Sequence, residues 1–396
     1  MQQLLVFFGA FLFLAFSGVF HSDKRVFNFS AGPASLPLPV LERARAELLG
    51  SSTGGAAVFE QSHRDAGGAV QVMMSRAVDR LRRLLSVPPS HEVLFMQGGA
   101  HGQFAALPLN LCSPGQTGDF VRTGFWSNRA RDEAARHAAV ATNLIEGVTA
   151  DGKSLRPASQ WNISSNSCFV HFCASETIDS LEYFEEPVLS RPEVPLVGDF
   201  TSTLLSRPVD VAKYGVIYAS GGKNLGPAGF VLVIVRRDLL SRVSSACPSV
   251  LSWKAHAETK PIPSLFNTPP VLALWLHELT TAYYESLGGM PVLAASVNRR
   301  KELVYGEIDG SDFYVMPVNK AHRSAMSISF TIAVKGVRRP DLEKKFVDES
   351  ASQGLIQLFG HPVRGGLRIT LYHGVPDAAV DALLIFMRKF RHENNF

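Results

Sequence analysis

Residues 216–229, VIYASGGKNLGPAG, are the stretch on which the prediction of the fold rests. The apolar run at 216–219 predicts a buried strand, and the glycines after it place Lys223 at the carboxyl end of that strand. A loop lysine is usually a solvated charge. Lys223 is less ordinary, because glycines enclose it and because it follows Asp199 by about one strand–helix–strand step. Open α/β sheets bind ligands beyond the carboxyl ends of their strands, so we expect an α/β fold with a ligand site here.

Helical and strand-like patterns alternate on both sides of this stretch. Residues 40–49 and 72–85 repeat apolar side chains at helical spacing. Short apolar runs without alternation are typical of strands that are buried on both faces. Such runs occupy residues 93–96, 140–145, 168–172, 194–197 and 231–235. The alternation predicts a mostly parallel sheet with helices on both faces.

The chain is expected to form two domains, because 396 residues are too many for one compact core. From about residue 294 the pattern changes. Residues 326–334 alternate apolar and polar side chains, as a half-buried antiparallel strand does, and residues 377–390 have the pattern of an amphipathic helix. The predicted parts are an apolar leader (1–21), an extended segment that packs with the small domain (22–37), a large domain (38–293) and a small α+β domain (294–396).

Composition excludes some classes of function. Lys and Arg number 39 against 35 Asp and Glu, a formal net charge of +4 without a dense basic run. This excess suits small anionic substrates and gives no indication of nucleic-acid binding. The cysteines show neither the spacing of a zinc site nor a disulfide framework, so we expect them to be reduced and expect no metal site. They are Cys112, Cys168, Cys173 and Cys247.

The N-terminus begins with an almost unbroken apolar run over residues 4–20. Its length is near the lower limit for a membrane span, and small residues near its end suit signal-peptide cleavage. A misassigned start codon is the competing explanation, because enzyme-like sequence begins at Val26. We expect a cytoplasmic protein, with a signal peptide or anchor over residues 1–21 as the alternative. Membrane contact would require that leader to be retained.

Three further features follow predicted strands. Residues 98–102, GGAHG, lie between a strand and a helix, where backbone N–H groups and the helix N-terminus can bind a phosphate. Asp199 ends one apolar run, and Trp126 lies in the segment TGFWS at 123–127. Alone, each has an ordinary explanation as a turn, a helix cap or a core residue. Together with Lys223 they predict a pyridoxal-phosphate site, in which the lysine forms a Schiff base, the aspartate keeps the pyridine nitrogen protonated and the aromatic ring stacks.

At these residues the chain resembles the phosphoserine aminotransferases, which belong to class V of the aminotransferases and to the type I fold of pyridoxal-phosphate enzymes. The resemblance implies a large domain with a mostly parallel seven-stranded sheet and a smaller C-terminal α+β domain. It extends in order from Val26 almost to the C-terminus. The matching stretches are NFSAGPA (28–34), SHR (62–64), QGG (97–99), GQF (102–104), PLNL (108–111), ETI (176–178), DFTST (199–203), SRP (206–208), KNLGPAG (223–229), FNTPP (266–270) and GGLR (365–368).

The resemblance also implies roles for the matching residues. Lys223 resembles the Schiff-base lysine, Asp199 the partner of the pyridine nitrogen and Trp126 the stacking ring. Arg368 resembles the arginine that holds the substrate α-carboxylate, for which a bidentate guanidinium is suited. The other implied cofactor-binding residues are Thr177 at the 3-hydroxyl, Ala100, His101 and Gly222, and, from the second subunit of a homodimer, Asn267 and Thr268. The other implied substrate-binding residues, around the distal anion, are His361, Arg364 and, across the dimer, His63 and Arg64.

The implied reaction is ping-pong amino transfer from L-glutamate to 3-phosphohydroxypyruvate, which yields O-phospho-L-serine and 2-oxoglutarate in serine biosynthesis. The implied assembly is a homodimer with shared active sites. Two alternatives are a class V aminotransferase with an unphosphorylated substrate and a non-catalytic homologue. The presence of Lys223, Asp199, Thr177, Trp126 and Arg368 argues against the non-catalytic alternative.

The chain departs from the family pattern at three places. Gly222 stands where a glutamine usually contacts the cofactor phosphate, and Ala100-His101 stand where Gly followed by Arg or Cys is usual. Pro362 stands where an arginine usually helps to bind the substrate phosphate, and Arg364, two residues on, is the candidate substitute. These changes affect the expected affinity for phosphate groups more than amino transfer itself.

Overall fold

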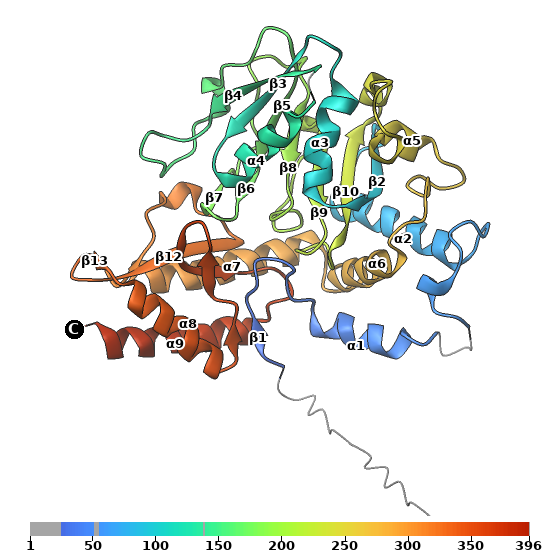
Figure 1. Cartoon of the computed structure of the whole chain (residues 1–396). Helices are drawn as coiled ribbons and strands as arrows, with labels where there is room; N and C mark the ends of the chain where they lie inside the picture. Colours follow the sequence, from blue (N-terminus) through green and yellow to red (C-terminus); the bar gives the residue numbers. More distant parts are fainter. Residues whose placement is uncertain (1–24, 51–54, 138, 396) are drawn as a thin grey trace, which may run out of the picture.

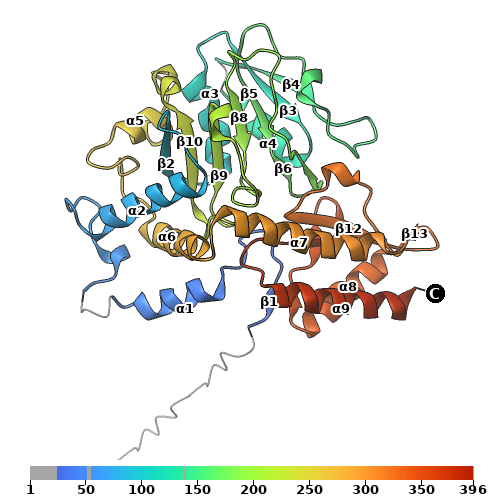
Figure 2. The same ribbon diagram turned by 180° about the vertical axis from the view of Figure 1, so that it is seen from behind.

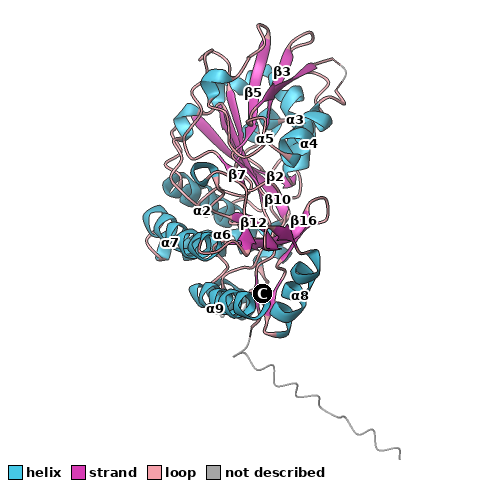
Figure 3. Cartoon of the chain, turned by 90° about the vertical axis from the view of Figure 1, so that its left-hand side faces the viewer, coloured by secondary structure: helices cyan, strands magenta, loops and turns pink. Residues whose placement is uncertain are grey.

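The computed structural model describes residues 25–50, 55–137 and 139–395. A seven-stranded sheet forms the upper part of the molecule in Figure 3, and a smaller sheet lies below it, next to α8 and α9. The helices are α1 (Leu38–Glu47), α2 (Ala69–Leu84), α3 (Ala100–Leu111), α4 (Phe125–Ala134), α5 (Trp253–Glu258), α6 (Val271–Ser286), α7 (Met290–Asp309), α8 (Pro340–Ser352) and α9 (Asp377–Asn394).

The large sheet is mostly parallel, as predicted. Only β10 runs antiparallel to its neighbours β2 and β9 among these seven strands, and the remaining neighbours are parallel. Every apolar run that was expected to form a buried strand of this sheet does so. In spatial order the strands are β2 (His91–Gly98), β10 (Gly229–Arg236), β9 (Val216–Ser220), β8 (Leu196–Asp199), β5 (Ser167–Cys173), β3 (Thr117–Arg122) and β4 (Ala141–Glu146).

Helices cover both faces of this sheet. Along β10, Val231 and Val233 belong to the core that contains residues of α3, α4 and α5, whereas Leu232 and Ile234 belong to the core that contains residues of α2 and α6. In Figure 1, α3 and α4 lie in front of the sheet, and Figure 2 shows α2 and α6 on the opposite side. Because both faces of β10 are covered, apolar side chains occupy consecutive positions along it.

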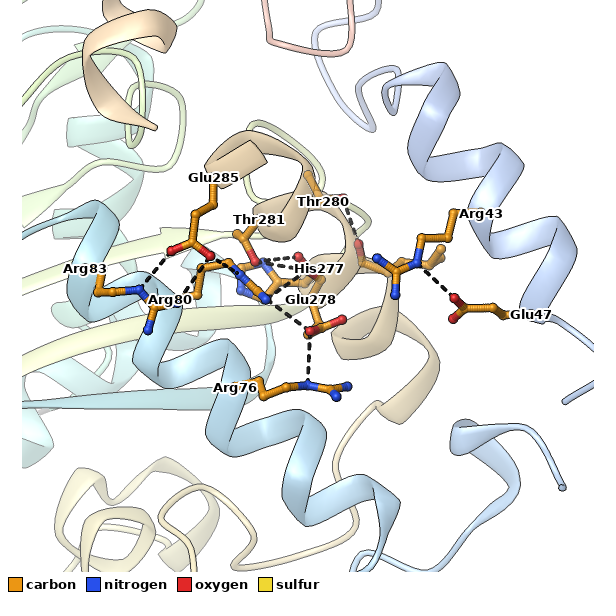
Figure 4. A network of polar contacts seen from close by, with 11 residues as sticks. Arg43, Glu47, Arg76, Arg80, Arg83, His277, Glu278, Thr280, Thr281 and Glu285 are labelled. Atoms are coloured by element: carbon orange, nitrogen blue, oxygen red, sulfur yellow. Dashed lines mark hydrogen bonds and ion pairs between the residues drawn. The ribbon is translucent and has the colours of Figure 1, made fainter. Parts of the chain in front are cut away.

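The helices α2 and α6 are joined by ion pairs (Figure 4). Arg80 of α2 lies 3.1 Å from a carboxylate oxygen of both Glu278 and Glu285 of α6. One residue before Glu278, the Nδ1 atom of His277 lies 2.6 Å from the backbone oxygen of Leu225. The ion pairs hold α6 against α2, and the His277 contact holds α6 against the loop that contains Lys223, because Leu225 lies two residues after Lys223.

The smaller sheet has an antiparallel centre, as the alternating sequence predicts. β12 pairs with β16 and alternates between buried and less buried residues at several positions. The helices α8 and α9 pack beside it (Figure 1). The strands of this sheet are β11 (Tyr314–Val315), β12 (Ser327–Val334), β13 (Val337–Arg338), β15 (Phe359–His361) and β16 (Gly365–Thr370), and two separate pairs are β1 (Phe27–Asn28) with β14 (Leu355–Ile356) and β6 (Ser175–Glu176) with β7 (Leu181–Glu182).

Two sequence-based boundaries stay predictions. The apolar leader over 1–21 lies outside the described residues, and the division at 293/294 falls within the first turns of α7. The segment 22–37, described from residue 25, pairs its β1 with β14 of the C-terminal part. Among the described residues we find no helix whose length and apolarity would allow it to cross a membrane.

The expectation that the cysteines are all reduced is wrong. Cys112 and Cys168 form a disulfide, whereas Cys173 and Cys247 are free. Cys112 directly follows α3 and Cys168 lies near the start of β5, with their Cα atoms 5.3 Å apart. The two cysteines are separated by 56 positions, so their proximity results from the packing of α3 on the sheet, which local cysteine spacing does not reveal.

Candidate active site

A cavity of about 230 Å³ lies at the carboxyl ends of β5, β8 and β9. This is the edge at which open α/β sheets bind ligands. The residues that the sequence singled out therefore meet at the predicted edge of the sheet, and their roles stay predictions. Six of the residues singled out in the sequence line the cavity: Ala100, His101, Trp126, Thr177, Asp199 and Lys223.

Lys223 is presented by a tight turn after β9. The backbone N–H of Gly222 donates to the Gly226 oxygen at 2.7 Å, and Gly222 has a φ of 90°, a conformation that favours glycine. The N-terminal segment passes against this turn, because the Ala34 N–H donates to the Gly222 oxygen at 2.8 Å. A Cβ atom on Gly32 would lie 3.1 Å from the Lys223 Cε atom, so a glycine there leaves room for the lysine stem. The sequence identified Gly32 only as part of a matching stretch.

Asp199 is the last residue of β8, and its side chain is almost fully buried. Burial raises the pKa of Asp199, and this effect is opposed by the hydrogen bonds from Thr201 and by the positive charge of Lys223. The Thr201 N–H donates to its Oδ1 atom at 2.9 Å. A buried carboxylate with few partners is suited to accept a hydrogen bond from a protonated ring nitrogen.

Trp126 lies on the other side of the cavity, in the first turn of α4. Its indole Nε1–H donates to the Thr177 Oγ1 atom at 2.9 Å, which fixes the orientation of the ring. The ring also contacts His101 edge-on, with their centroids 5.9 Å apart. The tryptophan, the threonine and the histidine therefore form one connected wall, although they come from three separate segments.

Two buried carboxylates hold the start of α4. The Glu176 carboxylate accepts hydrogen bonds from the backbone N–H groups of Trp126 at 2.9 Å and Ser127 at 2.8 Å. Asp179 accepts from the Phe125 N–H at 3.1 Å. Burial, with a further contribution from Asp179, raises the pKa of Glu176 to about 7. These bonds satisfy the unpaired N–H groups at the helix N-terminus and so set the position of Trp126.

The glycine-rich stretch after β2 leads into the N-terminus of α3. Gly98 has a φ of 93°, and a Cβ atom on Gly99 would lie 3.1 Å from the Ser220 Oγ atom. Gly99, Ala100 and His101 line the cavity where α3 begins. Because the first N–H groups of a helix have no partner within it, this end of the cavity is suited to an anionic group such as phosphate.

The predicted substrate-binding residues of the C-terminal part are not among the residues that line the cavity. Arg368, on β16, is half-buried, and burial lowers its pKa. Within the described part of the chain, its guanidinium has neither an ion pair nor a hydrogen bond. The His361 ring lies 5.6 Å from the Phe125 ring, next to Trp126, and Arg364 forms an ion pair with Asp179.

The four residues assigned by resemblance to a second subunit do not line this cavity. His63 is buried and its backbone oxygen accepts a hydrogen bond from Gln71 at 3.1 Å, whereas Arg64 is exposed. Asn267 and Thr268 precede α6. Their contribution to the site of a neighbouring subunit stays a prediction.

Several cavity residues were not identified individually from the sequence as site residues. They are small side chains at or just beyond the carboxyl ends of β5, β8 and β9, and their place near the ends of predicted strands is the feature that could have revealed them. They are Cys173, Ser175, Thr201, Ser202 and Ser220.

A larger cavity, of about 570 Å³, lies between the N-terminal segment and α6, α7 and α9. None of the residues predicted for the site lines it. Its charged residues are Arg25, Arg300 and Asp377, and the last two are bonded to each other at 2.8 Å. We therefore assign the chemistry to the smaller cavity, because that cavity brings together an amine, a buried carboxylate and an aromatic ring.

The residues present fit the cofactor expected from the sequence. The cavity offers a primary amine at Lys223, a buried carboxylate at Asp199, an oriented indole at Trp126 and a hydroxyl at Thr177. A helix N-terminus lies at the same cavity for a phosphate.

Comparison with known proteins gives the same family as the sequence. The model of the aminotransferase class V family matches residues 26–383. The structure of phosphoserine aminotransferase from Bacillus circulans subsp. alkalophilus is similar, with a TM-score of 0.87 and 35% identity, over 94% of this chain and 99% of that chain. PLP-bound phosphoserine aminotransferase from Trichomonas vaginalis has a TM-score of 0.84 and 33% identity, over 92% of this chain and 100% of that chain.

More distant structures share the fold alone. An alanine–glyoxylate aminotransferase from Nostoc sp. has a TM-score of 0.68 and 14% identity, over 93% of this chain and 95% of that chain. The fold is therefore common to aminotransferases with different substrates, and substrate choice has to be argued from side chains.

Proposed function

The chain belongs to the class V aminotransferase family, and on this premise we propose that it is a phosphoserine aminotransferase. The proposed reaction transfers the amino group of L-glutamate to 3-phosphohydroxypyruvate and gives O-phospho-L-serine and 2-oxoglutarate. The observation that supports it most is the meeting of Lys223, Asp199, Trp126 and Thr177 around one cavity, in a chain 35% identical to a phosphoserine aminotransferase.

Pyridoxal phosphate, when bound, supplies an aldehyde that takes up the amino group and a ring that accepts electrons from the substrate α-carbon. Lys223 holds the cofactor and, once released from it, moves a proton at the substrate α-carbon. Asp199 would hold the pyridine nitrogen, Trp126 would stack on the ring and Thr177 would bind the 3-hydroxyl group. The N-terminus of α3 with Ala100 and His101, the turn at Gly222, and Asn267 and Thr268 of a second subunit would hold the phosphate.

Arg368 is the proposed receptor of the substrate α-carboxylate. Its guanidinium is half-buried and has no ion pair among the described residues, so a carboxylate would relieve an uncompensated charge. His361 and Arg364 lie where α4 begins, close to Trp126, and are proposed to bind the distal phosphate together with His63 and Arg64 of a second subunit. Arg364 then exchanges its partner Asp179 for the substrate.

One observation favours a second candidate, an aminotransferase for unphosphorylated amino acids. Pro362 is exposed and supplies no charge, and Arg364 is already paired with Asp179. If Arg364 does not release Asp179, the distal phosphate lacks its main cation. The two candidates share the cofactor and Lys223 and differ only in the amino acid they accept.

The test is a half-reaction on PLP-loaded protein, without a keto acid. O-Phosphoserine, glutamate, serine and alanine are mixed in separately, and loss of the visible absorbance band of the bound cofactor is followed against concentration. The proposal predicts loss of the band with phosphoserine and glutamate at low concentrations, and no loss in Lys223→Ala. Loss of the band with serine or alanine alone would reject phosphoserine as the substrate and support the second candidate.

A further inference from the structure

Asp199 belongs to a line of polar side chains on one face of the sheet. It lies directly opposite Tyr218 of β9 and opposite Cys173 of β5 in the strand register. Directly paired residues of neighbouring strands project from the same face, and so does a residue two positions away along a strand. His171 of β5 is two positions before Cys173, so Asp199, Tyr218 and His171 share the face that α3 covers.

Tyr218 and His171 are joined by a hydrogen bond in the core. The Tyr218 hydroxyl oxygen lies 2.8 Å from the His171 Nε2 atom, and the two rings are stacked with an interplanar angle of 17°. Both side chains are fully buried, and the rings of Phe104 and Phe120 contact the imidazole. Burial takes two polar groups out of water, which costs free energy unless their hydrogen-bonding capacity is satisfied. The bond between the two rings satisfies part of it, and the rest is available for a further partner.

The position of the histidine proton follows from its second nitrogen. The Nδ1 atom of His171 is buried and has no hydrogen-bond partner among the described residues. Burial lowers the pKa of His171 to about 3, so the ring is neutral and holds one proton. A buried N–H donor without an acceptor is rarer than an unpaired acceptor, so the proton belongs on Nε2. The Nε2–H group then donates to the Tyr218 oxygen, and the tyrosine proton remains available.

We propose that His171 and Tyr218 are positioning residues for the cofactor: the His171 Nε2–H donates to the Tyr218 oxygen, and the Tyr218 hydroxyl donates to the Asp199 carboxylate. The donated proton stabilises the negative charge of Asp199 in a buried place, where desolvation alone would neutralise it. A charged Asp199 in turn keeps the facing pyridine nitrogen protonated. Neither His171 nor Tyr218 touches the substrate, and both act through Asp199.

Thr201 also donates to Asp199, and Tyr218 is the donor that is itself bonded to His171. Besides Tyr218, the groups with a charge or a titratable proton near Asp199 or its strand neighbour Cys173 are Lys223 on the loop after β9, the Cys173 thiol on β5, and Glu176 and Asp179 further along the chain. The two carboxylates are like charges, and burial and those charges raise the pKa of Cys173 well above its usual range, so the thiol is neutral. Burial likewise raises the pKa of Tyr218, which keeps its proton and remains a donor.

The first arm of the test determines the histidine proton directly. PLP-loaded full-length protein is labelled with [15N]histidine, and the ring nitrogens of His171 are identified as the signals lost in His171→Phe. Because His171 stays neutral in mild acid, its signals are separated from those of exposed histidines at that pH. The proposal predicts a proton on Nε2 and a bare Nδ1. A proton on Nδ1 overturns it, since the tyrosine would then donate to the histidine and not to Asp199.

The second arm measures the effect on the cofactor. Protein loaded with PLP labelled at the pyridine nitrogen is titrated, and the pH midpoint at which this nitrogen loses its proton is recorded. Tyr218→Phe removes one hydrogen bond to a charged group, so the midpoint is expected to fall by about one to two pH units, a roughly ten- to hundredfold change. His171→Phe shifts it in the same direction. Tyr214→Phe is the matched control, because Tyr214 is likewise fully buried. Its hydroxyl has no hydrogen-bond partner among the described residues and so is bonded to neither His171 nor Asp199.

An unchanged midpoint in a Tyr218→Phe protein that binds PLP overturns the proposal, and so does an equal shift in Tyr214→Phe. If Tyr218→Phe does not fold, the wild-type histidine proton and the His171→Phe midpoint decide. No amino-acid substrate is used. The inference rests on the cofactor of the proposed function and not on its substrate, so rejection of phosphoserine would leave the result intact.

Discussion

Replacement of Glu176 with glutamine tests how the start of α4 is held. The Glu176 side chain is fully buried and accepts N–H groups of Trp126 and Ser127, so it connects the fold to the cavity wall. Burial and the neighbouring Asp179 raise its pKa from 4.5 to about 7 in the folded protein. The folded state therefore holds this proton more tightly than the unfolded state does.

The sign of the effect on stability follows from linkage. Between pH 4.5 and about 7 the unfolded chain has released the Glu176 proton and the folded chain has not, so the free energy of unfolding falls as pH rises. The slope for one proton is about 1.4 kcal/mol per pH unit, and the window corresponds to roughly 3 kcal/mol in all. Below the window this contribution is fully present, and above it the contribution has been lost. Glutamine has no proton to release and lacks this dependence.

The assay is urea denaturation of wild type and Glu176→Gln at pH 5, 6, 7 and 8, followed by fluorescence. The stability of the variant relative to wild type should rise with pH by up to roughly 3 kcal/mol, since other buried carboxyl groups contribute equally to both proteins. Glu133→Gln, on the same helix and paired with Arg136, is the matched control and should run parallel to wild type. Parallel wild-type and Glu176→Gln profiles would refute the argument that Glu176 is buried with a raised pKa.

Three further predictions concern the lysine turn, the substrate phosphate and the disulfide. Gly32→Ala places a Cβ atom 3.1 Å from the Lys223 Cε atom at a φ of 148°. It should lower the free energy of unfolding in urea by about 1–3 kcal/mol and weaken PLP binding in equilibrium dialysis. An unchanged PLP affinity would contradict the close approach of Gly32 to Lys223. Arg364→Ala should raise the concentration of O-phosphoserine needed for the half-reaction by roughly ten- to hundredfold, without affecting alanine. Arg339→Ala, in which the lost arginine is paired with Asp341, should change neither. Cys112→Ala removes a disulfide between residues 56 positions apart and should lower the free energy of unfolding, measured without reductant, by about 4 kcal/mol. If reductant does not change the free energy of unfolding of the wild-type protein, that contribution is contradicted.

The sequence was sufficient for the strands whose residues are apolar on both faces. β8, β9 and β10 are covered by helices on either side, so their runs are continuous and easily recognised. β3 was not predicted, because it contains Asp119. That carboxylate is fully buried and accepts hydrogen bonds from Ser164 Oγ at 2.8 Å and Asn143 Nδ2 at 2.6 Å. Hydrogen bonds from other segments compensate for the burial of this carboxylate. A local sequence pattern does not show those partners, so it does not reveal the strand.

The candidate site divides in the same way. Lys223 and Asp199 were singled out because each lies at or just beyond the carboxyl end of a buried strand, which is a local feature. The approach of Gly32 to Lys223 and the bond between His171 and Tyr218 were not, because they join segments brought together only by folding. The residues assigned to a second subunit depend on assembly, which neither a local pattern nor a single chain specifies.

The most direct test of the central claim follows the nitrogen atom itself. PLP-loaded protein is incubated with [15N]glutamate and 3-phosphohydroxypyruvate, and O-phosphoserine is analysed by mass spectrometry. We expect 15N-labelled O-phospho-L-serine with wild type and with Lys213→Ala, an exposed lysine control, and none with Lys223→Ala. Absence of labelled phosphoserine with wild type, or its undiminished formation by Lys223→Ala, would rule out amino transfer to phosphohydroxypyruvate through Lys223.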